Sequence, residues 1–246
     1  TCALPIYEHI EVIEKTVEYA AGRVPVMAGT GSNATTEALD LTKRADQAGA
    51  DAFLLVAPYY NKPSQEGLYR HFSLLAECTA KPIMLYSIPG RCGIEITVET
   101  VVRLRQKHRN IIGIKDASGD LSRVTDHRMG IGKQFCQLSG DDELALPANA
   151  AGAVGCISVT ANVAPKLCAE FQAATLAGDY AKALEYQDRL MPLHEAIFIE
   201  PGLAGAKYGL SLLGLCSEEV RLPLVTLTEG TKARIKAKLV LEEDST

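Results

Sequence analysis

The chain has 246 residues, of which 47% are apolar and 22% are charged, and its net charge is −5 at neutral pH. That length is enough to bury a large core, either in one α/β barrel or in two smaller domains. The acidic balance and the lack of any block rich in lysine or arginine argue against a nucleic-acid or anionic-membrane surface.

The cysteines indicate a reducing compartment. There are seven of them, an odd number, scattered without a C-x-x-C pair and mostly in apolar company. This pattern favours free thiols over a disulfide framework or a zinc site. No apolar run approaches the ~20 residues that span a bilayer, and no secretory signal is visible at the start of the chain. We therefore expect a cytoplasmic protein.

Short apolar runs rich in β-branched residues alternate with stretches of helical spacing. Because these runs do not alternate strictly with polar residues, they are typical of strands that are covered on both faces, as in a parallel sheet. Ser64 and Thr97 stand where caps are expected, just before two of the helices. The predicted strands are 24–28, 53–57, 83–88, 111–114, 135–138 and 154–159, and the predicted helices are 7–21, 35–48, 65–76, 97–106 and 121–129.

This alternation predicts a parallel α/β architecture. Beyond residue 159 only helices are predicted, at 165–177, 179–198, 202–213 and from 229 onward. We therefore expect an α/β fold in residues 1–178, either an open sheet or a barrel, and a C-terminal helical region in 179–246. Since the chain begins on a helix that leads into a strand, an eight-stranded barrel would lack its first two strands here.

Lys115 is the leading catalytic candidate. In parallel barrels the functional residues gather where the strands end, and Lys115 follows the apolar run Ile111–Ile114. A lysine that is desolvated in this way shifts toward its neutral amine, which can attack a carbonyl group. The residues alone leave open a second interpretation, in which Lys115 forms an ion pair with Asp116 or Asp142.

Three further strand-end features carry possible chemistry. Tyr86 could shuttle a proton, since a phenol both donates and accepts hydrogen bonds, or it could be a packed tyrosine with a satisfied hydroxyl. Arg91 could hold a carboxylate with its two-pronged guanidinium or could be a solvated loop residue. Tyr59 and Tyr60 could belong to a core, an interface or a catalytic site.

Two other motifs are rejected. The segment GTGSNA from Gly29 matches a dinucleotide fingerprint, but the next strand ends in Pro58-Tyr59-Tyr60, without the acidic residue that would hold a ribose. The five histidines are isolated, with neither an H-x-H nor an H-E-x-x-H pattern, so no metal site is expected. Asp141 and Asp142 are interpreted as a loop that caps a helix rather than as a cation site.

Taken together, the strand ends resemble the dihydrodipicolinate synthase family. The resemblance runs in order along essentially the whole chain, and strings in that order at barrel-strand ends are highly specific. The strings are AGTGSNAT from Ala28, PYYNKPSQEGLY from Pro58, YSIPGR from Tyr86, GIKDASGD from Gly113, SGDD from Ser139 and ISVTAN from Ile157, followed by RLMPLH from Arg189 and IEPG from Ile199.

The resemblance implies a homotetrameric (β/α)₈ barrel, a dimer of dimers, of the N-acetylneuraminate lyase superfamily. Such an enzyme condenses pyruvate with aspartate semialdehyde in lysine and diaminopimelate biosynthesis. By the same resemblance, Lys115 would form an imine with pyruvate, so no separate cofactor is expected. Tyr86 would be the general acid and base, Arg91 would bind the semialdehyde carboxylate, and Tyr60 would complete a proton relay in the neighbouring subunit.

The same resemblance implies two binding regions. Gly140 and the backbone at Ile157 would line the pyruvate pocket. A feedback site for L-lysine would map to Thr1, Cys2, Ile6, His9, Asn33, Glu37 and Tyr59, of which His9, Asn33, Glu37 and Tyr59 fit a lysine-sensitive form.

The sequence departs from the family pattern at its start. A family GTTGE stretch is absent, so we expect the chain to lack about fifty N-terminal residues of the barrel. Ser87 replaces the family's asparagine, and Ile6 stands where a histidine is often found. The alternatives are therefore a sibling N-acetylneuraminate lyase or keto-sugar-acid aldolase, and a truncated, catalytically impaired form that binds lysine or pyruvate without turnover.

Overall fold

The computed structural model describes residues 4–243. The chain forms two compact units. Unit 1 comprises Thr1–Gly140 with Ala151–Ala153, and unit 2 comprises Asp141–Ala150 with Val154–Thr246. This is a different division of the chain from the expected boundary between residues 178 and 179, which stays a prediction.

Unit 1 is built on a parallel sheet whose strands follow one another in chain order. Among the described residues, the sheet consists of β1 (Met27–Gly29), β2 (Ala52–Val56), β3 (Ile83–Ser87), β4 (Ile111–Asp116) and β5 (Cys136–Ser139). The helices of this unit are α1 (Ile6–Ala20), α2 (Thr35–Gln47), α3 (Gln65–Glu77), the short α4 (Pro89–Cys92), α5 (Val98–Lys107) and α6 (Ser122–Ile131). The strand–helix alternation predicted from the sequence is thus confirmed for these strands.

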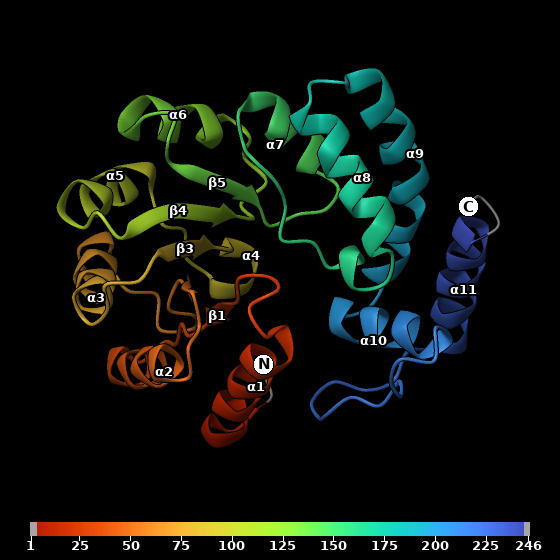
Figure 1. The fold of residues 1–246 in the computed structure, drawn as a ribbon, viewed down its shortest axis with the longest axis horizontal. Coiled ribbons are helices and arrows are strands. Elements are labelled where there is room, and N and C mark those ends of the chain that lie inside the picture. The colour runs from red at the N-terminus through yellow and green to blue at the C-terminus, as the bar shows by residue number, and fades with distance from the viewer. Residues whose placement is uncertain (1–3, 244–246) are drawn as a thin grey trace. The chain divides into compact units, whose positions relative to one another are not determined.

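The sheet is covered because its strands are apolar on both sides. The helices α2, α3, α5 and α6, which connect successive strands, lie along one side of it (Figure 1). Their apolar stripes supply Leu68, Phe72 and Leu104, and the strands supply Phe53 and Ile83, all fully buried in one core. A parallel sheet places the carboxyl ends of its strands along one edge, and the functional side chains follow from that arrangement.

The predicted caps form where the sequence placed them. The Ser64 side chain accepts a hydrogen bond from the Gly67 N–H at the start of α3, and the Thr97 side chain accepts one from the Thr100 N–H at the start of α5. Each cap satisfies a backbone donor that has no partner within its helix.

The prediction of a strand at 154–159 is wrong. In the described chain this segment contains a single bridge residue, Cys156, rather than a strand. Within it Gly155 has a φ of 154°, which interrupts the extended backbone that the apolar run suggested. The short helices α4 and α7 (Ala145–Ala151) were not predicted, because neither is long enough to show helical periodicity.

Unit 2 is helical, as predicted. Its main helices are α8 (Pro165–Leu176), α9 (Tyr180–Ile197), α10 (Gly202–Leu212) and α11 (Glu229–Glu243), with a 3₁₀ turn, η1 (Thr160–Asn162), before them. Leu167 and Phe171 of α8 pack with Ala183 and Leu190 of α9. Gly205 allows α10 to approach the Ile197 carbonyl at the end of α9, where a Cβ would collide with the backbone.

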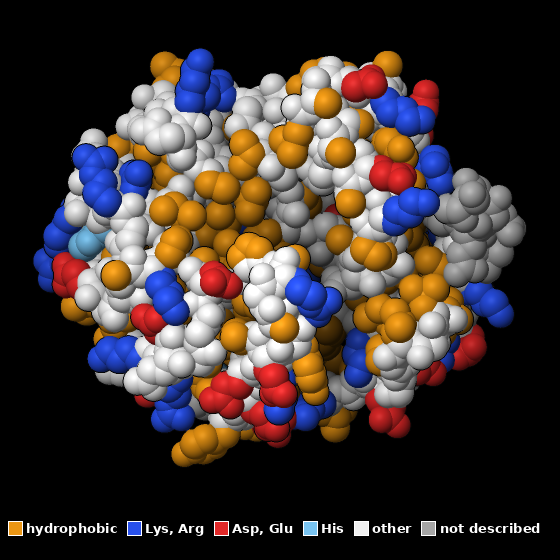
Figure 2. Space-filling model, viewed as in Figure 1, with side chains coloured by type: hydrophobic (Ala, Val, Ile, Leu, Met, Phe, Trp, Pro, Cys, Tyr) orange, Lys and Arg blue, Asp and Glu red, His pale blue; other side chains and the backbone are white. Residues whose placement is uncertain are grey.

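Two surface properties bear on the function. Among the residues that the structure describes, no helix is both long and apolar enough to cross a bilayer. Figure 2 shows one face of the molecule, on which lysine and arginine side chains are scattered among acidic and apolar ones rather than gathered in one block. This distribution agrees with the absence of a basic block in the sequence.

Candidate functional site

Lys115 and Tyr86 lie next to each other at the carboxyl end of the sheet. Each is the penultimate residue of its strand, and the parallel register aligns Tyr86 with Lys115 and Lys115 with Leu138. The two residues are 29 positions apart in sequence, as their numbers give directly. The sheet therefore brings together the two side chains that strand-end reasoning selected.

The Lys115 Nζ atom lies 4.1 Å from the centroid of the Tyr86 ring. At that distance an ammonium group is attracted by the ring face. Both residues are half-buried, so this pair is accessible to a small molecule while much of each side chain is shielded from water. A neutral amine here would be a nucleophile with a phenol beside it as a proton donor and acceptor.

Gly140 provides the space that Lys115 occupies. It follows β5 directly, and its N–H donates a hydrogen bond of 2.7 Å to the Asp116 carbonyl. A Cβ atom at Gly140 would lie 3.0 Å from Lys115 Cε and 2.8 Å from Ala117 Cβ. The residue expected to line the substrate pocket thus lies where any side chain would crowd Lys115, and its role in binding stays a prediction.

Arg91 is exposed on the short helix α4, which follows β3. The helix ends at Gly93, whose φ of 72° is a left-handed conformation suited to glycine, and the Gly93 N–H donates to the Pro89 carbonyl at 2.9 Å. The guanidinium is therefore presented from a tight turn after the strand that carries Tyr86.

Tyr60 stands out by its exposure and its backbone. Its side chain is 89% exposed, and its φ is 74°, an uncommon value for a residue with a Cβ. Its N–H donates to the carbonyl of Cys92 at 3.3 Å, which ties the loop after β2 to α4. Neighbouring Tyr59 is also exposed. Neither ring belongs to the core of unit 1, so the core interpretation of this pair is excluded.

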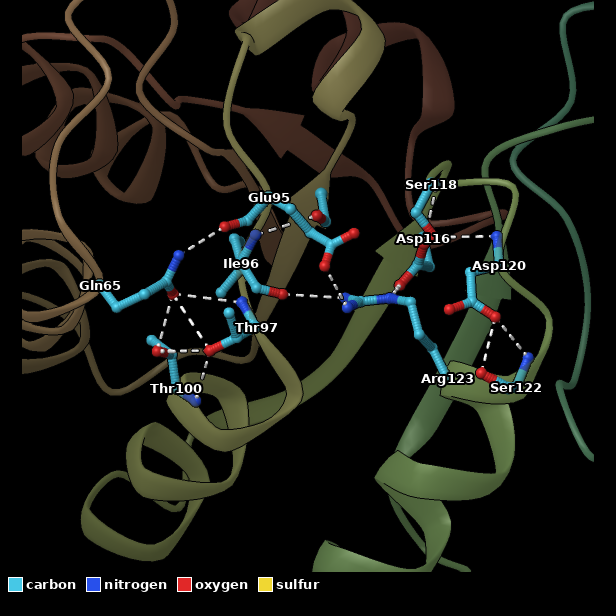
Figure 3. A network of polar contacts seen from close by, with 11 residues as sticks. Gln65, Glu95, Ile96, Thr97, Thr100, Asp116, Ser118, Asp120, Ser122 and Arg123 are labelled. Atoms are coloured by element: carbon cyan, nitrogen blue, oxygen red, sulfur yellow. Dashed lines mark hydrogen bonds and ion pairs between the residues drawn. The ribbon is translucent and has the colours of Figure 1, made fainter.

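A polar network centred on the buried Arg123 side chain joins the end of β4 to the segment before α5 (Figure 3). Arg123, on the first turn of α6, donates from Nε to Asp116 Oδ2, from one terminal nitrogen to Glu95 Oε1 and from the other to the Ile96 carbonyl, each at 2.8 Å. Sequence reasoning missed this residue. The available signal was an arginine at the positive end of a helix dipole, a place that disfavours cations unless acidic partners compensate.

The carboxylates of Asp116 and Asp142 have hydrogen-bond partners of their own. Asp116 binds Arg123 and also accepts from the Ser118 N–H at 2.9 Å. In unit 2, Asp142 Oδ2 accepts from the N–H groups of Val159 and Thr160, at 2.9 and 3.3 Å, at the start of η1. Asp142 thus binds backbone donors next to a 3₁₀ turn, and the interpretation of the Asp141–Asp142 loop as a helix cap stays a prediction.

Several residues predicted for lysine binding lie near the end of β1, the first strand of the sheet. His9 Nε2 is 2.8 Å from the Gly29 carbonyl, which joins α1 to the end of β1. Asn61 Nδ2 donates to the Asn33 carbonyl at 2.9 Å, and Ser32 donates to Glu37. Thr1 and Cys2 lie outside the described residues, as does the side chain of Ile6.

Unit 2 contains Ile157 and a cavity of its own. Ile157 is half-buried in the segment before η1. A cavity of about 220 Å³ is lined by residues of α8, α9, that segment and the Asp142 loop, including Cys156, Phe171 and His194. Burial lowers the pKa of His194, whose Nδ1 is 2.7 Å from Thr160 Oγ1. Among residues 4–243 no group of three or more His, Cys, Asp or Glu residues is arranged to hold a metal ion.

Comparison with known sequences gives a consistent set of relatives. The model of the dihydrodipicolinate synthetase family matches residues 2–241. The chain is 64% identical to the 4-hydroxy-tetrahydrodipicolinate synthase of Cereibacter sphaeroides and 62% identical to that of Ruegeria pomeroyi. Each match runs over 94% of this chain and 80% of the relative.

Solved structures agree with this result. The 4-hydroxy-tetrahydrodipicolinate synthase of Methylacidiphilum fumariolicum matches 98% of this chain and 81% of its own, with a TM-score of 0.96 and 43% identity. The chloride-inhibited Acinetobacter baumannii dihydrodipicolinate synthase complexed with pyruvate matches 97% and 82%, with a TM-score of 0.93 and 42% identity. The Cyanidioschyzon merolae enzyme with lysine bound matches 97% and 81%, with a TM-score of 0.94 and 35% identity.

These matches establish the fold and bear on one expectation. The chain has the same α/β barrel fold as these enzymes, with helices toward its C-terminal end. They do not support the expectation that about fifty N-terminal residues and the first two strands are missing, because the family model already matches from residue 2.

Proposed function

Since this chain belongs to the dihydrodipicolinate synthetase family, we propose that it is a lyase that condenses pyruvate with L-aspartate 4-semialdehyde. The product would be 4-hydroxy-tetrahydrodipicolinate, a precursor in lysine and diaminopimelate biosynthesis. The observation that carries the proposal within the chain is the position of Lys115 Nζ, 4.1 Å from the Tyr86 ring at the carboxyl end of the sheet.

The proposed chemistry begins with Lys115 as a nucleophile. Its neutral amine adds to the ketone carbon of pyruvate, and loss of water leaves an imine that withdraws electrons from the adjacent methyl group. A proton leaves that methyl group, and the resulting enamine carbon forms a bond to the aldehyde carbon of the second substrate. The amino group of that substrate then displaces Lys115 and closes the ring. The lysine itself supplies the electron sink, so the proposal requires no bound cofactor.

Tyr86 is proposed to move the protons of these steps. Its phenol can donate a proton as water leaves and accept one in return, which is the work of a general acid and base. The contact between its ring and Lys115 supports this assignment. The space that Gly140 leaves beside Lys115 Cε supports a pyruvate pocket here, to which the backbone at Ile157 is proposed to contribute.

Arg91 and Tyr60 are proposed to act at the outer part of the site. The exposed guanidinium of Arg91 could bind the semialdehyde carboxylate with two parallel hydrogen bonds. Tyr60 is proposed to reach the active site of a neighbouring subunit in a homotetramer built from dimers. Its 89% exposure and its left-handed backbone, which turns the ring away from its own core, support that role.

We also propose that L-lysine inhibits the enzyme at His9, Asn33, Glu37 and Tyr59. The lysine-bound relative from Cyanidioschyzon merolae supports this proposal. Glu37 is a natural partner for the ligand's ammonium group. Replacement of Glu37 with Gln should therefore weaken inhibition by lysine in the condensation assay while leaving the uninhibited rate near that of the wild type. Unchanged inhibition would remove Glu37 from the site.

A substrate panel tests the reaction. Purified protein is assayed for condensation of pyruvate with aspartate semialdehyde, and separately for cleavage of N-acetylneuraminate and of keto-sugar acids. We expect condensation only, and we expect Arg91→Ala to raise the KM of the semialdehyde without changing that of pyruvate. Cleavage of a sugar acid without condensation would assign the chain to a sibling activity instead.

A further inference from the structure

The segment between α4 and α5 is held from two sides by side chains of other elements. Its residues Glu95, Ile96 and Thr97 follow the turn that presents Arg91. On one side, Gln65 at the start of α3 donates from Nε2 to the Glu95 carbonyl at 2.8 Å and accepts from the Thr97 N–H at 3.2 Å. On the other side, Arg123 of α6 binds the Glu95 carboxylate and the Ile96 carbonyl.

Arg123 also contacts the end of the strand that carries Lys115. Its Nε donates to Asp116, the residue that follows Lys115 in β4. The Asp116 carbonyl in turn accepts from the Gly140 N–H beside the lysine. A single guanidinium therefore joins the segment after Arg91 to the backbone next to Lys115, as Figure 3 shows for the contacts of Arg123.

The contacts of Arg123 require an arginine. Its side chain is 6% exposed, and its three partners are each contacted at 2.8 Å from a different nitrogen of the planar fork. A lysine carries the same charge at one point and cannot reproduce that fixed geometry. The carboxylates of Asp116 and Glu95 are more exposed, at 18% and 38%, so the guanidinium is the buried centre of the network.

We propose that Arg123 is a positioning residue that fixes the separation between the Arg91 turn and the Lys115 strand end, and so sets the fit of the second substrate. The inference rests on the proposed function, in which Arg91 binds the semialdehyde carboxylate while its aldehyde reaches the enamine on Lys115. Arg123 contacts Glu95 in the segment that follows Arg91 and Asp116 next to Lys115. The contact with Glu95 can therefore be removed while the contact with Asp116 is kept.

The test combines two substitutions with kinetics for each substrate. Glu95→Gln keeps the size of the side chain and removes the ion pair to Arg123, so it should raise the KM of the semialdehyde about tenfold or more, as expected for a small misplacement. The KM of pyruvate and the rate of imine trapping with pyruvate should stay at the wild-type values. Arg123→Lys disturbs both sides, so it should raise the semialdehyde KM, lower kcat and slow the trapping.

A matched control is Arg103→Lys, because Arg103 pairs with Glu66 on the exposed surface of α5. It should leave every kinetic constant unchanged. Thermal melting of each variant separates folding from positioning. If Arg123→Lys does not fold, the Glu95→Gln kinetics decide alone.

The outcomes are distinct. A raised semialdehyde KM in folded Glu95→Gln, with pyruvate constants unchanged, supports the positioning role. Lowered melting temperatures with all KM values unchanged would make the network purely structural and overturn the inference, while the proposed function would stand. A wild-type protein that forms no imine and no product would overturn the proposed function, and the inference with it.

Discussion

At the scale of single residues, Lys115 depends on the absence of a side chain opposite it. A Cβ at Gly140 would lie 3.0 Å from Lys115 Cε, tighter than ordinary van der Waals contact, and 2.8 Å from Ala117 Cβ. The methylene of a flexible lysine can move, whereas Ala117 is fixed by its backbone. The added methyl group would therefore displace both the lysine and the strand end.

We predict that Gly140→Ala lowers kcat/KM for condensation by roughly tenfold to a hundredfold, because a small shift of a nucleophile from its attacking position is costly. Steady-state kinetics with both substrates would measure this. The control is Gly230→Ala in α11, where a Cβ would meet nothing within 4 Å. Equal activity of Gly140→Ala and wild type would show that the close contact has no catalytic consequence.

The sequence located the residues at strand ends but not those that act through side-chain networks. Lys115, Tyr86 and Arg91 each follow an apolar run, so their common edge could be predicted from the alternation of strands and helices. Arg123, on the first turn of α6, contacts Glu95, 28 positions earlier in the chain, in a connecting segment whose conformation no periodicity describes. Strand register can be inferred from a repeating pattern, whereas a side-chain contact between a helix and a connecting segment requires coordinates.

At the scale of elements, the helix starts were the most predictable feature because a cap has a local chemical cause. Ser64 accepts from the Gly67 N–H at 3.2 Å, and among the described residues its hydroxyl has no partner from a distant element. Thr97, by contrast, also binds Gln65, so its cap is part of the wider network. Ser64 is therefore the cleaner test of capping.

We expect Ser64→Ala to lower the free energy of unfolding by about 1 kcal/mol, the usual contribution of an N-cap side chain. Chemical denaturation followed by circular dichroism would measure the change. Ser64→Asp restores an acceptor at the same place and should recover most of the loss. If Ser64→Ala and Ser64→Asp unfold alike, the hydroxyl does not stabilise α3.

The predicted strand at 154–159 shows where the reasoning about elements failed. Its apolar run satisfied the composition of a strand, but composition does not report the backbone conformation at Gly155. The short helices α4 and α7 were not predicted, for a different reason. Four residues in α4 and seven in α7 give too few turns for a periodic pattern to appear.

At the scale of the whole molecule, buried histidines link stability to pH. Burial lowers the pKa of His71 from 6.5 to about 4. Its Nδ1 is 2.9 Å from Thr35 Oγ1. Because of the lowered pKa, the His71 ring is neutral in the folded protein at neutral pH. Burial also lowers the pKa of His127 and of His194. In the unfolded chain these rings titrate near their ordinary pKa.

Between pH 6.5 and about 4, the unfolded chain therefore binds a proton at His71 that the folded protein does not. The free energy of unfolding should fall across that window as the pH falls, by about 3 kcal/mol from this residue. His71→Asn, whose amide can replace Nδ1 toward Thr35, should flatten the decline without abolishing it, because His127 and His194 remain. Denaturation curves at several pH values would show this. The same decline in wild type and variant would exclude His71 as a source.

The central claim is that Lys115 forms an imine with pyruvate, and reduction with borohydride tests it most directly. Protein incubated with pyruvate and borohydride is examined by intact mass and by peptide mass spectrometry, with Lys115→Arg as the control. The account predicts one stable pyruvate adduct per chain, located on Lys115 and absent from the control. A folded wild-type protein without that adduct, or with the adduct on another lysine, would contradict it.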